Sequence, residues 1–213
     1  MNVLILKLNA TGDVVRTTTI LRKLQGEITW ITASVNAELL DGALPNLRCV
    51  TWEERERARD RRYDLVINLE DEVVTAAFAQ TVGHDQRYGA YLNGDQSVRY
   101  TEDSRSWFDL SLISVYGRKR ADELKLINRQ TYQEHLFEGL GFRFDGEPYV
   151  LPPAATTPLS GDVALAPVAG PVWPMKGWEY YDQLKQRLEE SGLRVNVLPR
   201  RQTLLEHMGD VKN

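Results

Sequence analysis

Two short loops of the sequence carry the side chains best suited to chemistry. In the first, Asn9 to Asp13, Gly12 permits close approach to the backbone and Asp13 stands where a helix is expected to begin. A carboxylate there could take a proton from a hydroxyl group as its oxygen attacks an anomeric carbon, which is general-base catalysis. A plainer alternative is that Asp13 or Thr11 only caps the helix.

The second loop, Ala166 to Trp178, combines small residues with Lys176 and two tryptophans. Lys176 precedes an expected helix, so its ammonium group and the free amides of the helix terminus are suited to bind a diphosphate. The alternative is a surface lysine whose alkyl chain lies along the protein. Trp173 and Trp178 are interpreted as packing residues, in a core or between two lobes, and not as a platform for a base.

The composition limits the class of protein. With 213 residues, 42% hydrophobic and 26% charged, the chain is typical of a globular protein and not of a disordered one. A formal net charge of -4 provides no overall attraction to nucleic acid. Cys49 is the one cysteine, which excludes an intrachain disulfide and a cysteine-based zinc site. Because no apolar run of about 18 residues could span a bilayer, we expect a cytoplasmic location.

Hydrophobic patterning predicts that both loops connect a strand to a helix. Continuous apolar runs, typical of strands covered on both faces, alternate with segments at helical spacing. Strands joined in this way predict a doubly wound parallel sheet, because parallel neighbours need a crossover connection. The charged segment from Glu53 to Arg62 is interpreted as a solvated helix face. The expected strands are 3–8, 28–32, 48–51 and 65–69, and the expected helices are 14–24, 35–40 and 73–80.

Beyond this series the pattern changes twice. From about 105 to 142 it is helical throughout, and the capping-box spacing of Thr131 and Glu134, with Gly141 to end the helix, predicts a helix over 132–140. Prolines between 148 and 161 indicate a linker. A second series follows, with strands expected at 163–167 and 194–198 and helices at 177–191 and 203–208. The predicted domains are 1–150, a linker at 151–161, and a partial lobe at 162–213.

Several motifs between Met1 and about Leu205 keep a distinctive order and spacing: Val3 to Lys7 with Gly12, Asp13, Val14, Val15 and Thr18; Tyr63 to Leu69; Ala121 to Lys125 with Asn128, Tyr132, Gln133, Glu134, Leu140 and Gly141; and Lys176, Gly177 and Trp178. In this order and spacing they resemble one known family, glycosyltransferase family 9, which includes the lipopolysaccharide heptosyltransferases.

The resemblance implies a two-lobed GT-B-like fold, in which 1–150 is the acceptor-side domain and 162–213 is part of the sugar-nucleotide donor domain. It also implies a metal-independent, inverting transfer of a sugar from a nucleotide-activated donor. The donor is usually ADP-linked heptose, and the acceptor is a glycan or a glycolipid of the lipopolysaccharide type. By the same resemblance Asp13 is the catalytic base and Lys176 contacts the donor diphosphate, while Thr11 and Gly12 are assigned to substrate or donor binding. No cofactor other than the donor, no metal and no nucleic acid are expected, and peripheral membrane contact is allowed.

The sequence departs from the family pattern in its last part. Family members continue through an Asp-Thr-Gly or similar loop and a histidine that complete the donor site, and nothing in this sequence corresponds. The second lobe is therefore expected to be incomplete. The alternative hypothesis is a non-catalytic remnant or binding module that retains the acceptor-side lobe and pairs with a partner, with self-association through the incomplete lobe as one form of such pairing. A nicotinamide-dependent enzyme is disfavoured because the first loop lacks spaced glycines. No role is assigned to His207, and His84 and His135 are interpreted as surface or loosely packed residues.

Overall fold

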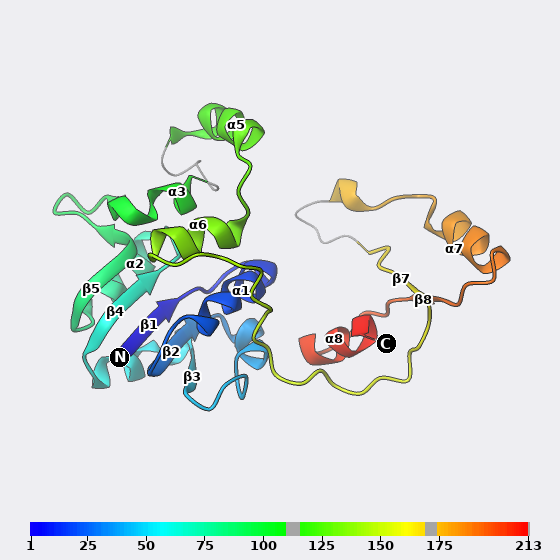
Figure 1. Ribbon diagram of the computed structural model, residues 1–213, viewed down its shortest axis with the longest axis horizontal. Coiled ribbons are helices and arrows are strands. Elements are labelled where there is room, and N and C mark those ends of the chain that lie inside the picture. Colours follow the sequence, from blue (N-terminus) through cyan, green and yellow to red (C-terminus); the bar gives the residue numbers. More distant parts are fainter. Residues whose placement is uncertain (110–115, 169–173, 213) are drawn as a thin grey trace. The chain divides into compact units, whose positions relative to one another are not determined.

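The computed structural model describes residues 1–109, 116–168 and 174–212. The chain divides into two compact units, Met1–Pro152 and Pro153–Asn213 (Figure 1). The assignment of acceptor and donor roles to the two predicted domains stays a prediction.

The first unit is built on a six-stranded sheet, and the predicted fold class is confirmed. Its strand order is β3-β2-β1-β4-β5-β6, with β1 to β5 parallel and β6 antiparallel to β5. The order reverses between β1 and β4, as in doubly wound α/β proteins. The strands are β1 (Asn2–Leu6), β2 (Glu27–Thr32), β3 (Leu47–Thr51), β4 (Tyr63–Asn68), β5 (His84–Leu92) and β6 (Val98–Tyr100).

Helical segments cover both faces of this sheet. Because side chains alternate along a strand, Val3 and Ile5 enter one buried cluster and Leu4 and Leu6 enter the other. This double burial explains the continuous apolar runs in the sequence. The first cluster lies under α1 (Thr11–Thr17), η1 (Thr18–Arg22), α3 (Arg105–Phe108) and α6 (Tyr132–Gly139); the second lies under α2 (Val73–Thr81) and η3 (Trp52–Asp60).

The first predicted helix, 14–24, differs from the observed structure. The chain forms the short α-helix α1, which ends at Thr17, and continues from Thr18 as the 3-10 helix η1. The hydroxyls of Thr17, Thr18 and Thr19 each donate to a backbone carbonyl three or four residues earlier. Such bonds compete with the regular helix ladder, which explains the change in winding. The predicted helix at 35–40 is likewise a 3-10 helix, η2 (Ser34–Leu39).

Other predictions for this unit are confirmed or extended. The predicted helix at 73–80 is α2, and the charged segment forms η3, in which Ala58 is the buried residue. The strands β5 and β6 were not predicted, because the polar start of β5, from His84 to Arg87, interrupts any apolar run. The first half of β5 is exposed or half-buried, and polar residues are accepted at strand positions of this kind.

The helical region is confirmed at its sharpest boundary. Thr131 accepts a bond from the Glu134 amide, and the Glu134 side chain accepts one from the Thr131 amide, which completes the capping box that begins α6. Gly141 has the left-handed conformation, with φ +77°, just after the helix. The helix α5 (Arg118–Ile127) precedes α6, and the expected helical residues 110–115 lie outside the described residues.

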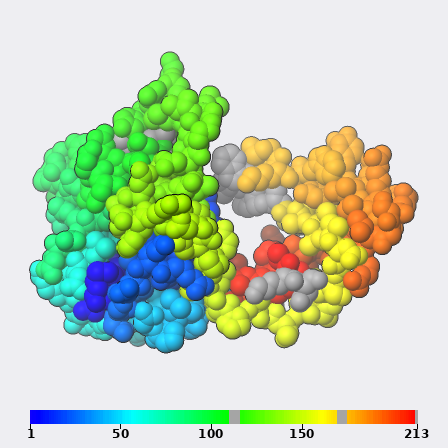
Figure 2. All heavy atoms as spheres, viewed as in Figure 1, coloured from blue at the N-terminus to red at the C-terminus, as the bar shows by residue number. Residues whose placement is uncertain are grey.

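The segment that follows α6 packs back on the start of the chain. The Val150 amide donates to Thr18 Oγ1 at 3.0 Å, and Lys23 Nζ lies 2.5 Å from Glu147 Oε1. In Figure 2 yellow-green atoms from this part of the chain lie against blue atoms from near its start. These contacts close the first unit.

The second unit contains a parallel pair of strands, β7 (Val163–Leu165) and β8 (Val195–Val197), with η5 (Pro174–Lys176), α7 (Tyr181–Glu190) and α8 (Leu204–Lys212). The helix expected from 177 begins at Tyr181. Arg201 Nε donates to Asp210 Oδ2 at 2.5 Å, and Thr157 donates to the same carboxylate. The hydrogen bonds from Arg201 lower the pKa of Asp210 to about 2. The contact between Thr157 and Asp210 joins α8 to the segment before β7. Across the described residues, no helix has the length and apolarity that a bilayer crossing requires.

Gly89 offers a test of the sheet. It has φ +102°, and a Cβ added there would lie 2.0 Å from the carbonyl oxygen of Asn68 in the neighbouring strand. Gly89→Ala should therefore lower the free energy of unfolding by about 3 kcal/mol, measured by urea denaturation of the full chain. The control is Gly94→Ala, where the new Cβ meets no described atom within 4 Å. Equal stability of the two variants would contradict this account of β5.

Candidate active site

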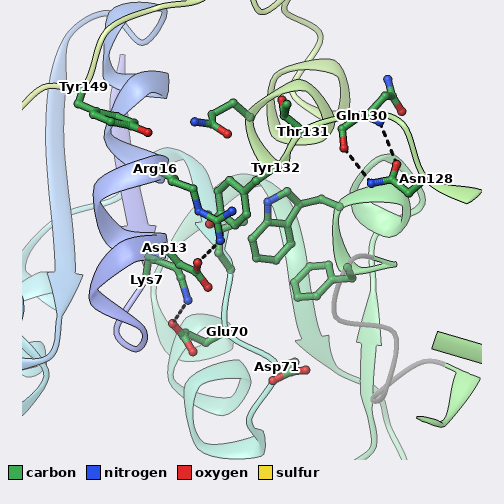
Figure 3. A pocket seen from close by; sticks show the side chains of 14 residues that line it. Lys7, Asp13, Arg16, Glu70, Asp71, Asn128, Gln130, Thr131, Tyr132 and Tyr149 are labelled. Atoms are coloured by element: carbon green, nitrogen blue, oxygen red, sulfur yellow. Dashed lines mark hydrogen bonds and ion pairs between the residues drawn. The ribbon is translucent and has the colours of Figure 1, made fainter. Parts of the chain in front are cut away.

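A pocket of about 700 Å³ opens at the carboxyl ends of β1 and β4. These two strands are neighbours at the point where the strand order reverses, and ligands of open α/β sheets gather at such points. Two loops and the helical region surround the pocket (Figure 3). It is lined by Lys7, Asp13, Arg16, Leu69, Glu70, Asp71, Trp107, Phe108, Asn128, Gln130, Thr131, Tyr132, Gln133 and Tyr149.

A buried ion pair forms the floor of this site. Lys7 Nζ donates to Glu70 Oε1 at 2.8 Å, and the two side chains are 6% and 8% exposed. The amides of Leu8 and Asn9 donate to the same oxygen at 2.7 and 3.0 Å. Three donors therefore satisfy one buried carboxylate oxygen, which compensates the cost of removing both charges from water.

Two further side chains hold the carbonyl groups of the same loop. Trp30 Nε1 donates to the Lys7 carbonyl at 3.2 Å, and Asn36 Nδ2 donates to the Leu8 carbonyl at 2.7 Å. The Thr11 hydroxyl in turn donates to Asn36 Oδ1 at 2.7 Å. The loop after β1 is thus fixed by hydrogen bonds from its amides, its carbonyls and one of its side chains.

The capping alternative for this loop is wrong. Ala10 occupies the N-cap position of α1 with φ 58° and ψ 88°, and the helix has no side-chain cap. A left-handed alanine costs about 1–3 kcal/mol and persists where its surroundings impose it. The helix starts at Thr11. Asp13 is therefore inside the first turn, where its carboxylate turns toward the pocket instead of the helix amides.

Asp13 lines the pocket, whereas Thr11 and Gly12 are not among its lining residues. The Asp13 side chain is 32% exposed, and its Oδ1 accepts an ion-pair hydrogen bond from Arg16 Nη2. The guanidinium carbon of Arg16 lies 4.4 Å from the centre of the Tyr132 ring, which is a cation–π contact. Figure 3 shows these two side chains together with Asp13. The second oxygen of Asp13, Oδ2, has no hydrogen bond to any described residue.

The sequence did not identify Lys7, Glu70, Arg16 and Tyr132 as site residues. Lys7 and Tyr132 were recognised only as parts of family motifs. Lys7 and Glu70 carry a usable signal, since each is a charged residue at the end of a buried strand. The carboxyl ends of parallel neighbours meet at one edge, so two such charges are expected to pair. Arg16 and Tyr132 carry no comparable signal, because 116 positions of sequence separate them.

The second loop is only partly described, and two expectations for it need correction. Lys176 ends the short η5, and the α-helix begins at Tyr181, so Lys176 is not beside that helix terminus as predicted. Trp178 is 49% exposed and packs edge to face with Tyr180 and Tyr181, so it is not a core residue, and its packing between two lobes stays a prediction. Trp173 lies outside the described residues.

One histidine also differs from its expected setting. His135 is 7% exposed, and its Nε2 is 3.0 Å from Asn128 Oδ1. It faces inward because it shares the buried side of α6 with Leu136 and Phe137. Burial lowers the pKa of His135 and favours the neutral ring. His84 is half-buried, and within the described ranges no three His, Cys, Asp or Glu side chains are arranged to hold a metal ion.

The doubly wound sheet and its pocket define a Rossmann-like α/β protein with a polar pocket at the carboxyl edge of the sheet. Solved structures with a similar fold are glycosyltransferases. The family 9 glycosyl transferase from Veillonella parvula DSM 2008 has a TM-score of 0.57 at 19% identity, over 100% of this chain and 67% of that chain. The E. coli heptosyltransferase WaaC with ADP-2-deoxy-2-fluoro heptose has a TM-score of 0.55 at 19% identity, over 95% of this chain and 70% of that chain.

WaaC with ADP is similar to the same degree, with a TM-score of 0.54 at 17% identity over 94% of this chain and 67% of that chain. No protein-family model and no curated protein matches the sequence. At these identities the likeness concerns the fold, and it confirms the GT-B-like fold class expected from the sequence motifs.

The ion pair at the floor of the pocket can be tested directly. Glu70→Gln leaves the buried Lys7 charge without its carboxylate, so the free energy of unfolding should fall by about 3 kcal/mol in urea denaturation. The matched control is Glu72→Gln, an exposed residue in the same loop, which should change it by less than about 0.5 kcal/mol. A Glu70→Gln protein as stable as the control would show that the pair is not needed for folding.

Proposed function

We propose that this protein is a glycosyltransferase that moves a heptose-like sugar from a nucleotide-sugar donor to a glycan or lipopolysaccharide-type acceptor. The observation that carries the proposal is the Asp13 carboxylate, which borders a large polar pocket at the switch point of the sheet. The fold shared with WaaC and the family 9 glycosyl transferase supports it. The pocket is large enough for a sugar, and its polar side chains are suited to hydroxyl groups.

The proposed reaction is a single displacement that needs no metal ion. An acceptor hydroxyl oxygen bonds to the anomeric carbon of the donor as the bond from that carbon to the diphosphate oxygen breaks. The hydroxyl proton passes to Asp13 Oδ2, and the nucleoside diphosphate leaves with the bonding electron pair. Attack from the side opposite the leaving group inverts the anomeric centre. A base in hydrogen-bond reach of the attacking hydroxyl contributes about 10²- to 10⁴-fold to the rate.

The donor side of the proposal rests on Lys176 and on the loop before Asp13. An ammonium group compensates the charge that develops on the departing diphosphate, which is the role assigned to Lys176. Gly12 has no Cβ, and an added one would meet no described atom within 4 Å, so its backbone is open to a ligand beside Thr11. The sugar nucleotide named with WaaC, an ADP-heptose analogue, supports an ADP-linked donor for this chain.

The base role of Asp13 predicts a large loss of rate on a small structural change. Asp13→Asn should lower sugar transfer from ADP-heptose to heptose-deficient lipopolysaccharide by at least about 100-fold, measured by mass spectrometry of the product. The Asp41→Asn control removes an exposed carboxylate elsewhere and should transfer at the parent rate. Transfer by Asp13→Asn at the control rate would remove the base role. Binding of ADP-heptose without transfer by the parent protein would favour the non-catalytic binding module.

The diphosphate role of Lys176 predicts an effect on donor affinity. Lys176→Met should raise the KM for ADP-heptose about tenfold, because a charge-assisted contact to the diphosphate is lost. Lys185→Met, which removes an exposed lysine of α7 paired with Glu189, is the matched control. If both variants have the parent KM, the diphosphate is bound by other residues.

A further inference from the structure

Tyr132 contacts two adjacent residues of α1, Arg16 and Thr17, which follow Asp13 by about one helical turn. Its ring faces the guanidinium of Arg16, which holds Asp13 Oδ1. Its hydroxyl lies 2.6 Å from Oγ1 of Thr17, the next residue along the same helix. Tyr132 begins α6, so these contacts join two helices that are more than a hundred residues apart in the sequence.

The direction of the hydroxyl bonds follows from the donors available. Thr17 Oγ1 lies 2.7 Å from the Asp13 carbonyl oxygen, which can only accept, so the Thr17 proton is committed to that bond. The Tyr132 hydroxyl must then donate to Thr17. Tyr132 is 9% exposed, and burial raises its pKa, so the phenol keeps its proton and remains a donor. The chain of bonds from Tyr132 through Thr17 ends on the Asp13 backbone.

The ring contact acts on the Asp13 side chain. An exposed arginine samples many rotamers, and ordering it costs up to about 2 kcal/mol of side-chain entropy. The Tyr132 ring restricts the Arg16 guanidinium to one face, from which Nη2 reaches Oδ1 of Asp13. Trp107 packs edge to face behind the Tyr132 ring, with centroids 5.3 Å apart, and keeps that ring in place. Oδ2 is left without a hydrogen bond to any described residue.

We propose that Arg16 and Tyr132 are positioning residues that hold Asp13 for proton abstraction, Arg16 through the carboxylate and Tyr132 through both Arg16 and Thr17. We call this set of four residues the Asp13 clamp. Its catalytic effect rests on the proposed function, whereas its mechanical effect on α1 does not. A misplacement of a catalytic group by about 1 Å can cost 100-fold in rate, so a clamp of this kind has a measurable consequence.

The mechanical effect is tested by hydrogen–deuterium exchange on the full chain. Tyr132→Phe removes the hydroxyl bond and Tyr132→Leu also removes the ring, so amide exchange across Thr11–Thr17 should be faster in both, by about fivefold or more in the second. Tyr149→Phe removes the hydroxyl of another residue that lines the same pocket, one that makes no hydrogen bond to α1 within the described structure, and it should leave exchange in α1 unchanged. Parent exchange rates in α1 of Tyr132→Leu would overturn the proposal.

The catalytic effect is tested by a double-mutant cycle with ADP-heptose and heptose-deficient lipopolysaccharide. Arg16→Met and Tyr132→Leu should each lower kcat about 10- to 100-fold with little change in the KM for ADP-heptose. Arg16→Lys keeps the charge and should restore part of that loss. In the Asp13→Asn background, Arg16→Met should cause no further loss, because Arg16 acts through Asp13. A full additional loss there would mean an independent role and would overturn the proposal.

Two failures remain distinguishable. If Asp13→Asn transfers sugar at the parent rate, the proposed function fails, and the exchange measurement still decides whether the clamp exists. If Asp13→Asn is inactive while Arg16→Met and Tyr132→Leu keep the parent kcat, the clamp fails and the proposed function stands.

Discussion

The pocket depends on one buried carboxylate that joins the ends of two central strands. Glu70 follows β4, and its Oε1 accepts bonds from Lys7 and from two amides of the loop after β1. Without these bonds the loop would bury unsatisfied donors, and with them it turns sharply enough to place Ala10 in the left-handed region. The first turn of α1, and Asp13 with it, is therefore presented at the carboxyl edge of the sheet.

Aromatic side chains connect this edge to the helical region. Rings from β6, α3 and α6 follow one another in contact, from Tyr100 through Phe108 and Trp107 to Tyr132. The two contacts of Trp107 are edge to face, and such contacts favour one relative geometry more than aliphatic packing does. The same cluster thus forms the wall of the pocket and sets the place of Tyr132 over Arg16. The contact of Trp107 with Tyr132 therefore both packs the helical region and positions a residue of the pocket.

The likeness to solved glycosyltransferases at 17–19% identity is understandable in these terms. A sheet covered on both faces requires apolar residues of suitable size at alternating positions, and many combinations meet that requirement. The fold can therefore persist while most side chains change. What distinguishes one member of such a fold is the set of polar residues at the carboxyl edge, where loops replace the repeated pattern.

Most of the first four strands, the capping box of α6 and the change of character near the prolines were predictable from the sequence, because each is written in local periodicity or in a turn residue. The polar start of β5 hid that strand, and the threonine hydroxyls turned a predicted α-helix into a 3-10 helix. The position of Asp13 after the first strand, where a helix begins, was enough to predict it as a site residue. The sequence by itself determined which residues stand at strand ends and helix starts, since backbone preference acts over a few residues. Only the tertiary structure decided that Glu70 meets Lys7 and that Tyr132 meets Arg16, because those contacts depend on which strands and helices become neighbours after the chain has packed.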